Sequence, residues 1–287
     1  MPRNEARTYR HIEVVPVSGA LGAEVRGVNV AAALDDAVIG EIRQALLDHL
    51  VIFFRDQKLA PPEQLAFAGR FGVPMEYPQL KGLPECPLIT PVLKLAHETI
   101  NFGGVWHSDT TYLTQPPMAS MLYAVELPPY GGDTIFANQY LAYESLSDGM
   151  KRMLADLRAV HTDRMVAGPA ARMNERRSTK VREDDAWRET VNVHPVVRTH
   201  PETGRKCLFV NRSYTVGFEG MTEEESAPLL NFLLEHGHRP EFTCRFRWTD
   251  GAVTFWDNRC VKHLAIKDSG PFRRYMRRVQ IAGDRPV

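Results

Sequence analysis

The sequence predicts a mainly β protein with flanking α-helices. From about residue 87 onward, short apolar runs alternate with Pro and Gly, the pattern of an all-β barrel or sandwich. Helical spacing of apolar residues is confined to a few segments, most of them before this region. The chain has 287 residues, of which 44% are hydrophobic, enough for a sizeable core. We expect one domain over residues 1–287, because β-barrels of this size often form a single unit.

The first part of the chain is expected to hold strands and two helices. Residues 12–30 combine short apolar runs with three glycines, which indicates strands and turns. Asp35-Asp36 can cap a helix, because apolar residues follow at helical spacing: Ile39, Ile42, Leu46 and Leu50. Residues 51–54, Val-Ile-Phe-Phe, predict a buried strand. Pro61-Pro62 opens a second helix, which Gly72 is expected to end.

One helix interrupts the β-rich region. Residues 222–225, Thr-Glu-Glu-Glu, form a capping-box pattern, four leucines follow at helical spacing, and Gly237 ends the segment. After this helix, residues 243–248 and 252–256 have the composition of two strands. The Asp250-Gly251 pair between them is typical of a tight turn, so this stretch predicts a β-hairpin.

Charge and cysteine content exclude several classes of partner. Lys plus Arg equals Asp plus Glu at 35 each, so the chain has no bulk field that would attract nucleic acid or an anionic membrane. The four cysteines are scattered without a Cys-x-x-Cys pair, which favours a reducing interior over a disulfide framework. The N-terminal residues are polar, and no apolar run approaches the roughly 20 residues that a membrane helix needs. We expect a soluble cytoplasmic protein.

Residues 162–190 differ from their surroundings. They are strongly basic and carry few large apolar groups. A long polar segment inside a compact β domain is often an active-site lid, and a solvated surface excursion is the alternative. The basic residues of this segment are Arg164, Arg172, Arg176, Arg177, Lys180, Arg182 and Arg188.

Two histidines and one aspartate are candidate metal ligands. His107 and Asp109 are two residues apart, so on an extended chain their side chains face the same side and can bind one ion. His263 follows a strand-like run and can supply a third ligand at the mouth of a barrel. This 2-His-1-carboxylate set holds Fe(II) and leaves open positions for substrates and O2, while a zinc-type metallohydrolase is the alternative. His194 and His200, each next to a proline, are rival ligands that we expect to be structural.

Two further segments are candidate anion-binding elements. Arg274 and Arg278 are four residues apart, so on a strand they share one face, while Arg273 and Arg277 share the other. Buried guanidinium groups favour carboxylate partners, but periodicity alone does not choose the buried face. Thr134 follows a Gly-Gly-Asp turn, and its hydroxyl can donate to a carboxylate, although such turns are often only structural.

Taken together, these segments resemble the taurine dioxygenase and phenoxyacetate dioxygenase family of Fe(II)- and 2-oxoglutarate-dependent enzymes. The resemblance spans nearly the whole chain. It rests on Val-Ile-Phe-Phe-Arg-Asp-Gln (51–57), Arg-Phe-Gly (70–72), Trp-His-Ser-Asp (106–109), Pro-Pro-Tyr-Gly-Gly-Asp-Thr (128–134), His-Pro-Val-Val-Arg-Thr-His-Pro (194–201), Leu-Phe-Val-Asn (208–211), Trp-Asp-Asn-Arg-Cys-Val-Lys-His (256–263) and the final arginine-rich strand.

The resemblance implies a fold and roles for individual residues. The fold would be a double-stranded β-helix, a cupin-like jelly roll with helices packed outside it. The iron ligands would be His107, Asp109 and His263. Thr134 and Arg274 would hold the distal carboxylate of 2-oxoglutarate, and Arg278 would lie near its chelating end or meet an anionic group of the substrate.

The resemblance also implies the reaction and the class of substrate. The enzyme would hydroxylate a small anionic organic compound, cleave heteroatom-linked substrates after hydroxylation, and release succinate and CO2. Segments 73–78 and 101–105 and the residues after His161 depart from taurine dioxygenases toward a more apolar or roomier pocket. A sulfonate, an alkyl sulfate or an aryloxyalkanoate is therefore expected as substrate, rather than taurine alone. The expected substrate contacts are Tyr77, Val105, Val166, Tyr214 and Arg278.

Two other expectations complete this interpretation. Members of such a family are expected to form homo-oligomers, here a dimer or a tetramer, although nothing in the charge pattern indicates it. A cupin-like protein that keeps the fold but binds its ligand without catalysis is a further alternative to the dioxygenase.

Overall fold

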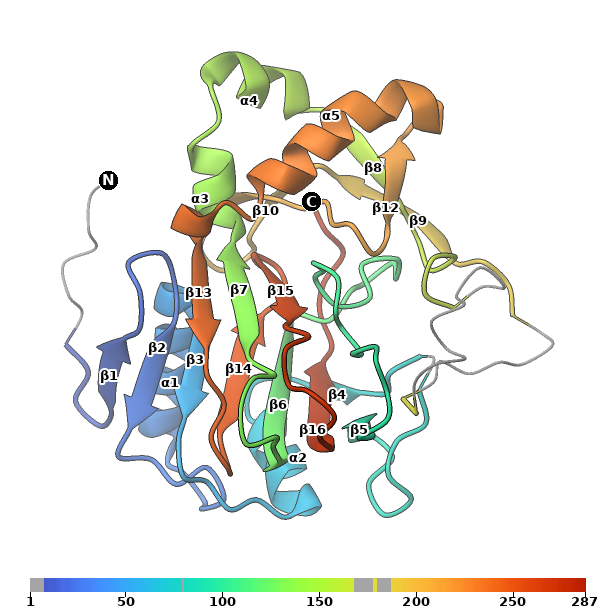
Figure 1. Ribbon diagram of the computed structural model, residues 1–287. Helices are drawn as coiled ribbons and strands as arrows, with labels where there is room; N and C mark the ends of the chain where they lie inside the picture. The colour runs from blue at the N-terminus through green and yellow to red at the C-terminus, as the bar shows by residue number, and fades with distance from the viewer. Residues whose placement is uncertain (1–7, 79, 168–177, 180–186) are drawn as a thin grey trace.

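The computed structural model describes residues 8–78, 80–167, 178–179 and 187–287. Most of its regular structure is β, and α-helices lie around the sheets (Figure 1). The predicted class, mainly β with flanking helices, is confirmed at this level.

The described residues form helices and strands from one end of the chain to the other. The helices are α1 (Asp36–His49), α2 (Pro61–Gly69), α3 (Gln139–Glu144), α4 (Asp148–Leu154) and α5 (Glu223–His236), with a 3-10 turn, η2, at Pro240–Phe242. The strands are β1 (Glu13–Pro16), β2 (Ala23–Arg26), β3 (Val51–Phe54), β4 (Pro74–Met75), β5 (Thr90–Lys94), β6 (Ala119–Glu126), β7 (Thr134–Asn138), β8 (Arg158–Thr162), β9 (Val191–Pro195), β10 (Val197–Thr199), β11 (Lys206–Leu208), β12 (Thr215–Phe218), β13 (Thr243–Phe246), β14 (Val253–Asp257), β15 (Val261–Ala265) and β16 (Arg274–Ile281).

Two sheets face each other around an aromatic core. The larger sheet has the order β1-β2-β3-β14-β6-β16-β4, with β5 also paired to β16, and the smaller has the order β13-β7-β15. Every pairing in these sheets is antiparallel except that of β2 with β3. Phe53 of the larger sheet stacks on Phe246 of the smaller, with ring centroids 4.0 Å apart. Phe136, Trp256 and Met276 belong to the same buried cluster, which joins the two sheets.

Side-chain alternation gives the larger sheet a second buried face. Ile52 and Phe54 of β3 pack with Phe255 of β14 in a different cluster from Phe53 and Trp256. The same cluster includes the apolar residues of α1 and α2, so both helices cover this outer face (Figure 1). The continuous Val-Ile-Phe-Phe run is therefore buried on both sides, as predicted for this strand.

Three helices lie at one end of the sheets. α3, α4 and α5 pack with β10, β11 and the β12-β8-β9 sheet around a third apolar cluster (Figure 1).

The capping box that predicts α5 is present: the Thr222 hydroxyl accepts from the Glu225 amide, and the Glu225 carboxylate accepts from the Thr222 amide. α1 begins directly after Asp35 as predicted, although the Asp35 side chain makes no capping hydrogen bond. α2 ends at Gly69, before the predicted Gly72.

The predicted hairpin between β13 and β14 is wrong. β13 pairs with β7 in the smaller sheet, whereas β14 pairs with β3 and β6 in the larger. The turn carries the chain from one sheet to the other. Gly251 has φ of +72°, and a Cβ there would lie 2.3 Å from the carbonyl oxygen of Gln57. The glycine is therefore required by a contact with a distant segment, which the local turn signal cannot distinguish from a hairpin.

Residues 162–190, predicted as a lid, lie largely outside the described residues. Among those that are described, Asp163 accepts hydrogen bonds from the Trp187 indole and from the Thr190 amide. The lid stays a prediction. In the part of the chain that the structure describes, no helix combines the length and hydropathy of a membrane span.

Candidate active site

His107, Asp109 and His263 meet beside the space between the two sheets. The Nε2 atoms of His107 and His263 lie 3.5 and 3.8 Å from Oδ1 of Asp109. One donor atom from each residue lies within 4.8 Å of the other two. The side chains are buried, with 7%, 2% and 10% of their surfaces exposed for His107, Asp109 and His263. Two imidazole nitrogens and one carboxylate oxygen at one point form a donor set for a divalent transition metal.

Backbone pairing brings the two histidines together. His107 forms an isolated antiparallel bridge with His263 of β15, with N–O distances of 3.1 and 2.7 Å. Their rings lie 4.1 Å apart. His107 Nδ1 donates to the Val105 carbonyl at 2.7 Å, so its Nε2 keeps a free lone pair toward Asp109. The bridge therefore positions two residues that are far apart in the sequence.

A second set of side chains orients the carboxylate. The Ser120 hydroxyl donates to Asp109 Oδ2 at 2.6 Å, and the Asn258 amide donates to Ser120 at 2.8 Å. Asn258 Oδ1 accepts from the Trp256 indole and from the Asp109 amide. Sequence reasoning did not assign roles to Ser120 or Asn258. The only available signal was that Asn258 lies inside a motif quoted for the family resemblance.

Asp109 is ionised in this environment. Burial alone would raise the pKa of its carboxyl group, but the nearby positive charge of Arg278 holds the pKa well below its ordinary value. Arg278 Nη1 donates to Asp109 Oδ1 at 3.4 Å. Burial has the opposite effect on His263 and lowers its pKa well below the ordinary value, so this imidazole is neutral and able to bind a metal.

A cavity next to the triad is lined by two buried arginines, some of whose N–H groups lack a partner among the described residues. Arg274 and Arg278 both line it, together with Thr134. In each of the two arginines, Nε and Nη2 are buried and lack a hydrogen-bond partner among the described residues. Burial lowers the pKa of Arg274 to about 10. The Thr134 hydroxyl accepts from the Trp248 indole at 3.0 Å, so its own proton is free to be donated into the cavity.

The structure shows which face of β16 lines the cavity. Arg273 pairs with Glu126 at the surface, and Arg277 donates to the Leu59 carbonyl on the helix-covered side. Arg274 and Arg278 face the space between the sheets. Buried N–H groups of this kind require acceptors, so the cavity is suited to an anion with several oxygens.

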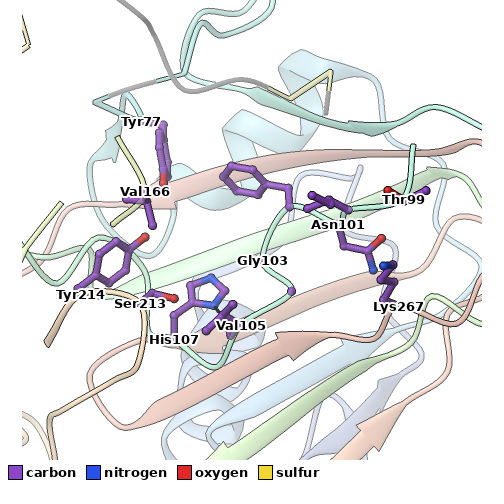
Figure 2. A pocket seen from close by; sticks show the side chains of 13 residues that line it. Tyr77, Thr99, Asn101, Gly103, Val105, His107, Val166, Ser213, Tyr214 and Lys267 are labelled. Atoms are coloured by element: carbon purple, nitrogen blue, oxygen red, sulfur yellow. Dashed lines mark hydrogen bonds between the residues drawn. The ribbon is translucent and has the colours of Figure 1, made fainter. Parts of the chain in front are cut away.

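A second pocket adjoins His107 (Figure 2). Four of the residues predicted to contact substrate line it: Tyr77, Val105, Val166 and Tyr214. The fifth, Arg278, lies against the rings of Tyr77 and Phe102, at 4.4 and 5.3 Å from their centroids. Phe102 and Lys267 also line this pocket. Phe102 belongs to segment 101–105, which departs from taurine dioxygenases, whereas no local pattern in the sequence indicated Lys267.

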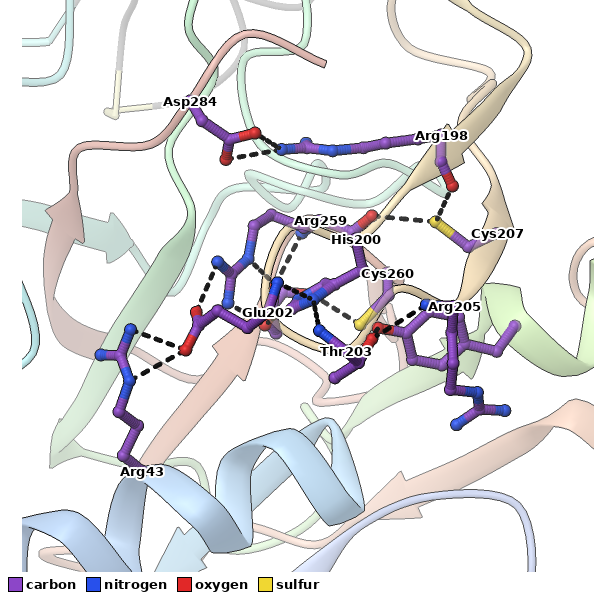
Figure 3. A network of polar contacts seen from close by, with 12 residues as sticks. Arg43, Arg198, His200, Glu202, Thr203, Arg205, Cys207, Arg259, Cys260 and Asp284 are labelled. Atoms are coloured by element: carbon purple, nitrogen blue, oxygen red, sulfur yellow. Dashed lines mark hydrogen bonds and ion pairs between the residues drawn. The ribbon is translucent and has the colours of Figure 1, made fainter. Parts of the chain in front are cut away.

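The rival histidines lie elsewhere. His194 Nε2 donates to the Leu113 carbonyl, and its ring packs against His161 in the β12-β8-β9 sheet. His200 lies close to Asp257 and Cys260, a second group with metal-binding donor types (Figure 3). His200 Nδ1 accepts from two backbone amides, so Nε2 carries the proton and donates to Asp257 at 3.0 Å.

The Asp257 carboxylate is already occupied by protein groups. Arg259 donates to both of its oxygens, at 2.9 and 2.6 Å, and also to Glu202 at 2.7 Å. Glu202 in turn pairs with Arg43 of α1 (Figure 3). Burial would raise the pKa of Asp257, but the charge of Arg259 keeps it well below the ordinary value. This cluster is therefore a buried ionic cross-link and not a second metal centre.

Comparison with known proteins decides the family. The family model described as "Taurine catabolism dioxygenase TauD, TfdA family" matches residues 13–280. The chain belongs to this family. It is accordingly an α-ketoglutarate-dependent dioxygenase, and its family uses α-ketoglutarate (2-oxoglutarate) as cosubstrate together with a non-heme metal. The zinc-hydrolase and non-catalytic alternatives are not supported by this match.

Individual relatives agree with the family assignment. An α-ketoglutarate-dependent sulfate ester dioxygenase from Pseudomonas putida is 34% identical over 278 residues, which cover 96% of this chain and 91% of that protein. A taurine dioxygenase structure from Burkholderia xenovorans has a TM-score of 0.82 and 37% identity, covering 97% and 91% of the two chains. The structure of AAD-2 in complex with Mn(II) and N-oxalylglycine has a TM-score of 0.78 and 27% identity, covering 96% and 98%.

Replacing Asp257 should destabilise the fold. Asp257→Asn leaves the Arg259 guanidinium buried without its counter-ion, so we expect the free energy of unfolding to fall by about 3 kcal/mol at pH 7. The pKa of Asp257 is lowered by folding, so the wild-type pair stabilises the protein above the unfolded pKa of about 4 and loses this contribution as the pH falls below it. Urea unfolding at pH 7 and pH 3.5 measures both effects.

A matched control is Asp36→Asn, because Asp36 pairs with Arg70 but its side chain is fully exposed. This exposed pair should contribute less than about 1 kcal/mol. Equal stability of Asp257→Asn and the wild type would contradict the role given to the buried cross-link.

Proposed function

We propose that His107, Asp109 and His263 hold Fe(II), and that the adjoining cavity binds 2-oxoglutarate. The second pocket would take an anionic substrate that carries an apolar group. The observation that supports this proposal most directly is a buried N,N,O donor set beside a cavity in which Nε and Nη2 of both arginines have no partner in the described structure. Family membership supplies the reaction class, and these residues supply places for its components.

The protonation states of the triad residues and the open space beside them both suit a bound metal ion. His107 presents a free Nε2 because Nδ1 is held by Val105, and Asp109 is ionised. His107 and His263 both line the cavity, and His107 also lines the substrate pocket. A metal held there would have protein ligands on one side and accessible space on the other, which is the arrangement that non-heme iron oxygenases need.

The cavity fits a dicarboxylate. Arg274 and Thr134 both adjoin Trp248, whose ring centroid is 5.6 Å from the Arg274 guanidinium and whose indole N–H donates to Thr134. The two residues can therefore bind one carboxylate, with Arg274 supplying charge-assisted N–H donors. Arg278 hydrogen-bonds to Asp109 and therefore lies nearer the triad. We assign Arg274 and Thr134 to the distal carboxylate of 2-oxoglutarate, and Arg278 to the end close to the metal.

The protein's own contribution is orientation and exclusion of water. Ser120 and Val105 hold the ligands Asp109 and His107 in one orientation, so the ligands require little rearrangement when a metal binds. The aromatic walls of Phe136 and Trp256 pack against His263. Bound Fe(II) and 2-oxoglutarate would supply the oxidising chemistry, in which 2-oxoglutarate and O2 become succinate and CO2 while one oxygen atom enters a substrate C–H bond.

We propose a sulfate ester, a sulfonate or an aryloxyalkanoate as substrate. The sulfate ester dioxygenase and the taurine dioxygenase among the similar proteins support this class. The carbon next to the heteroatom would be hydroxylated. In a sulfate ester the new hydroxyl then loses its proton, the C–O bond to sulfate breaks, and an aldehyde and sulfate are released.

The fold is part of the same proposal. Strands β1 and β16, from opposite ends of the chain, belong to one sheet, which supports a single domain over residues 1–287. The two facing sheets support the double-stranded β-helix that the family implies. Assembly into a dimer or tetramer, and the cytoplasmic location, remain predictions from the sequence.

Loss of a triad ligand should abolish the metal signal. Anaerobic mixing of the protein with Fe(II) and 2-oxoglutarate should give a visible charge-transfer band. We expect His107→Ala and Asp109→Ala to lose this band, because each removes one of the three ligands, while circular dichroism remains that of a folded protein. His194→Gln serves as the histidine control and should keep the band. An unchanged band in either ligand variant would refute the assignment.

The two faces of β16 should differ in 2-oxoglutarate affinity. Arg274→Ala removes charge-assisted hydrogen bonds in a buried cavity, so we expect the dissociation constant for 2-oxoglutarate to rise at least about tenfold. Arg273→Ala removes an exposed ion pair and should change it less than about twofold. Titration of the same band measures both constants. The reverse ranking would show that the cosubstrate binds elsewhere.

Substrate-dependent succinate formation tests the substrate class. Sulfonates, sulfate esters and aryloxyalkanoic acids with apolar groups of increasing size should be compared at fixed 2-oxoglutarate. We expect at least one of these classes to raise succinate formation above the substrate-free rate, with stoichiometric aldehyde or leaving group. No stimulation by any class would reject the proposal, and product formation without O2 or 2-oxoglutarate would instead support a hydrolase.

A further inference from the structure

The segment that follows Asp109 has an unfavourable backbone conformation. Thr110 has φ of 42°, a left-handed conformation that costs free energy in a β-branched residue. Its hydroxyl is buried and has no hydrogen-bond partner among the described residues, so its own side chain does not offset this cost. Contacts made by the neighbouring residues must therefore hold this conformation in place.

Thr111 makes contacts of this kind through its buried side chain. Its hydroxyl accepts a hydrogen bond from the Asn211 side chain at 2.8 Å and lies 2.9 Å from Nδ1 of His161 on β8. His161 belongs to the β12-β8-β9 sheet, and Asn211 lies a few residues before β12. The segment after Asp109 is thus held by a part of the chain outside the two facing sheets.

Asn211 also closes the turn that carries Tyr214. Its Oδ1 accepts from the backbone amides of Ser213 and Tyr214, at 3.2 and 3.1 Å. Because two N–H groups point at this end, it must be the oxygen, and Nδ2 must be the end that donates to Thr111. Ser213 and Tyr214 line the substrate pocket beside His107 (Figure 2). One side-chain amide therefore holds the pocket wall with its oxygen and the segment after Asp109 with its nitrogen.

A second asparagine supports the same segment without this link. Asn192 of β9 donates to the Tyr112 carbonyl at 2.7 Å and accepts from the Thr114 hydroxyl at 3.1 Å. Neither hydrogen bond reaches the turn at residues 213–215. Asn192 therefore supports the segment, whereas Asn211 joins it to the wall of the pocket.

We propose that Asn211 is a positioning residue that couples the wall of the substrate pocket to Asp109 through the Thr111 hydroxyl. The inference rests on the proposed function and adds a connection between its two sites. A substrate that packs against Tyr214 acts on the turn that Asn211 closes, and this turn acts on Thr111 through one hydrogen bond. Asp109 lies two residues away across the strained Thr110, so a small movement of Thr111 changes the direction of the carboxylate.

Matched variants of Thr111 test this link. Thr111→Val keeps nearly the same shape but has no hydroxyl, whereas Thr111→Ser keeps the hydroxyl and should resemble the wild type. Thr243→Val is the control. It also removes a threonine hydroxyl, one that donates to the Pro240 carbonyl and lines neither pocket.

Hydrogen exchange of the full-length protein, with and without Fe(II) and 2-oxoglutarate under anaerobic conditions, tests the connection itself. In Thr111→Val we expect the amides of Ser213 and Tyr214 to exchange about fivefold faster, because Asn211 loses the partner of its Nδ2 and the turn opens more often. Thr111→Ser and Thr243→Val should exchange at the wild-type rate. Mass spectrometry of the peptide that contains both amides measures this. Unchanged exchange in Thr111→Val would overturn the inference, because the two segments would then be independent.

Turnover separates positioning from stability. The probe is hexyl sulfate, or the most active compound of the substrate screen in its place, with ascorbate present as reductant. Thr111→Val should lower kcat about tenfold and leave KM within about twofold, because the pocket is intact while the ligand is misplaced. It should also form more succinate per product than the wild type.

A merely structural role gives a different result. It would lower the melting temperature of Thr111→Val and leave both kcat per folded protein and the ratio of succinate to product unchanged, and that outcome also overturns the inference. A wild type that no substrate class stimulates rejects the proposed function, whereas the exchange measurement still decides whether the two segments are connected.

Discussion

The site is governed by charge that is buried and only partly neutralised by the protein itself. Asp109, Arg274 and Arg278 are buried, and among the described residues the charge of Asp109 is paired only with that of Arg278. The remaining N–H groups of the two arginines have no partner in the described structure. Such groups are costly unless a ligand meets them. Strands of both sheets line this cavity.

A second buried ionic cluster shows the contrast. Asp257 receives hydrogen bonds from Arg259 and His200, and Arg259 also meets Glu202, so every charge there has a counter-charge from the chain. Both clusters combine carboxylate, imidazole and guanidinium groups in the interior. The two clusters differ in whether their polar groups have partners within the protein. The Asp257 cluster, whose charges are paired, links the β10-β11 region to β14 and α1. The cluster at the triad, which keeps unpartnered N–H groups, faces two pockets. Residue type alone does not separate a structural cluster from a binding site.

Local strain and tight backbone contacts accompany the site. Thr110, directly after Asp109, has φ of 42°, a left-handed conformation that is unfavourable for a β-branched residue. Such conformations persist only where the surrounding structure imposes them, and they concentrate at functional sites. The Gly131-Gly132 turn similarly accepts positive φ to let Asp268 approach. Thr110 directly follows Asp109 of the triad, and the Gly131-Gly132 turn precedes Thr134, which lines the cavity.

Features with a local cause were determined by the sequence alone. The α5 capping box, the doubly buried β3 strand and the two-residue spacing of His107 and Asp109 depend on neighbours within a few positions, and each is present in the structure. Features with a non-local cause were decided only by tertiary contacts. The buried face of β16 depends on pairing with β5 and β6, and the predicted hairpin fails because β13 and β14 join different sheets. His263 meets His107, and Lys267 reaches the pocket, through backbone contacts between distant segments, which no local periodicity encodes.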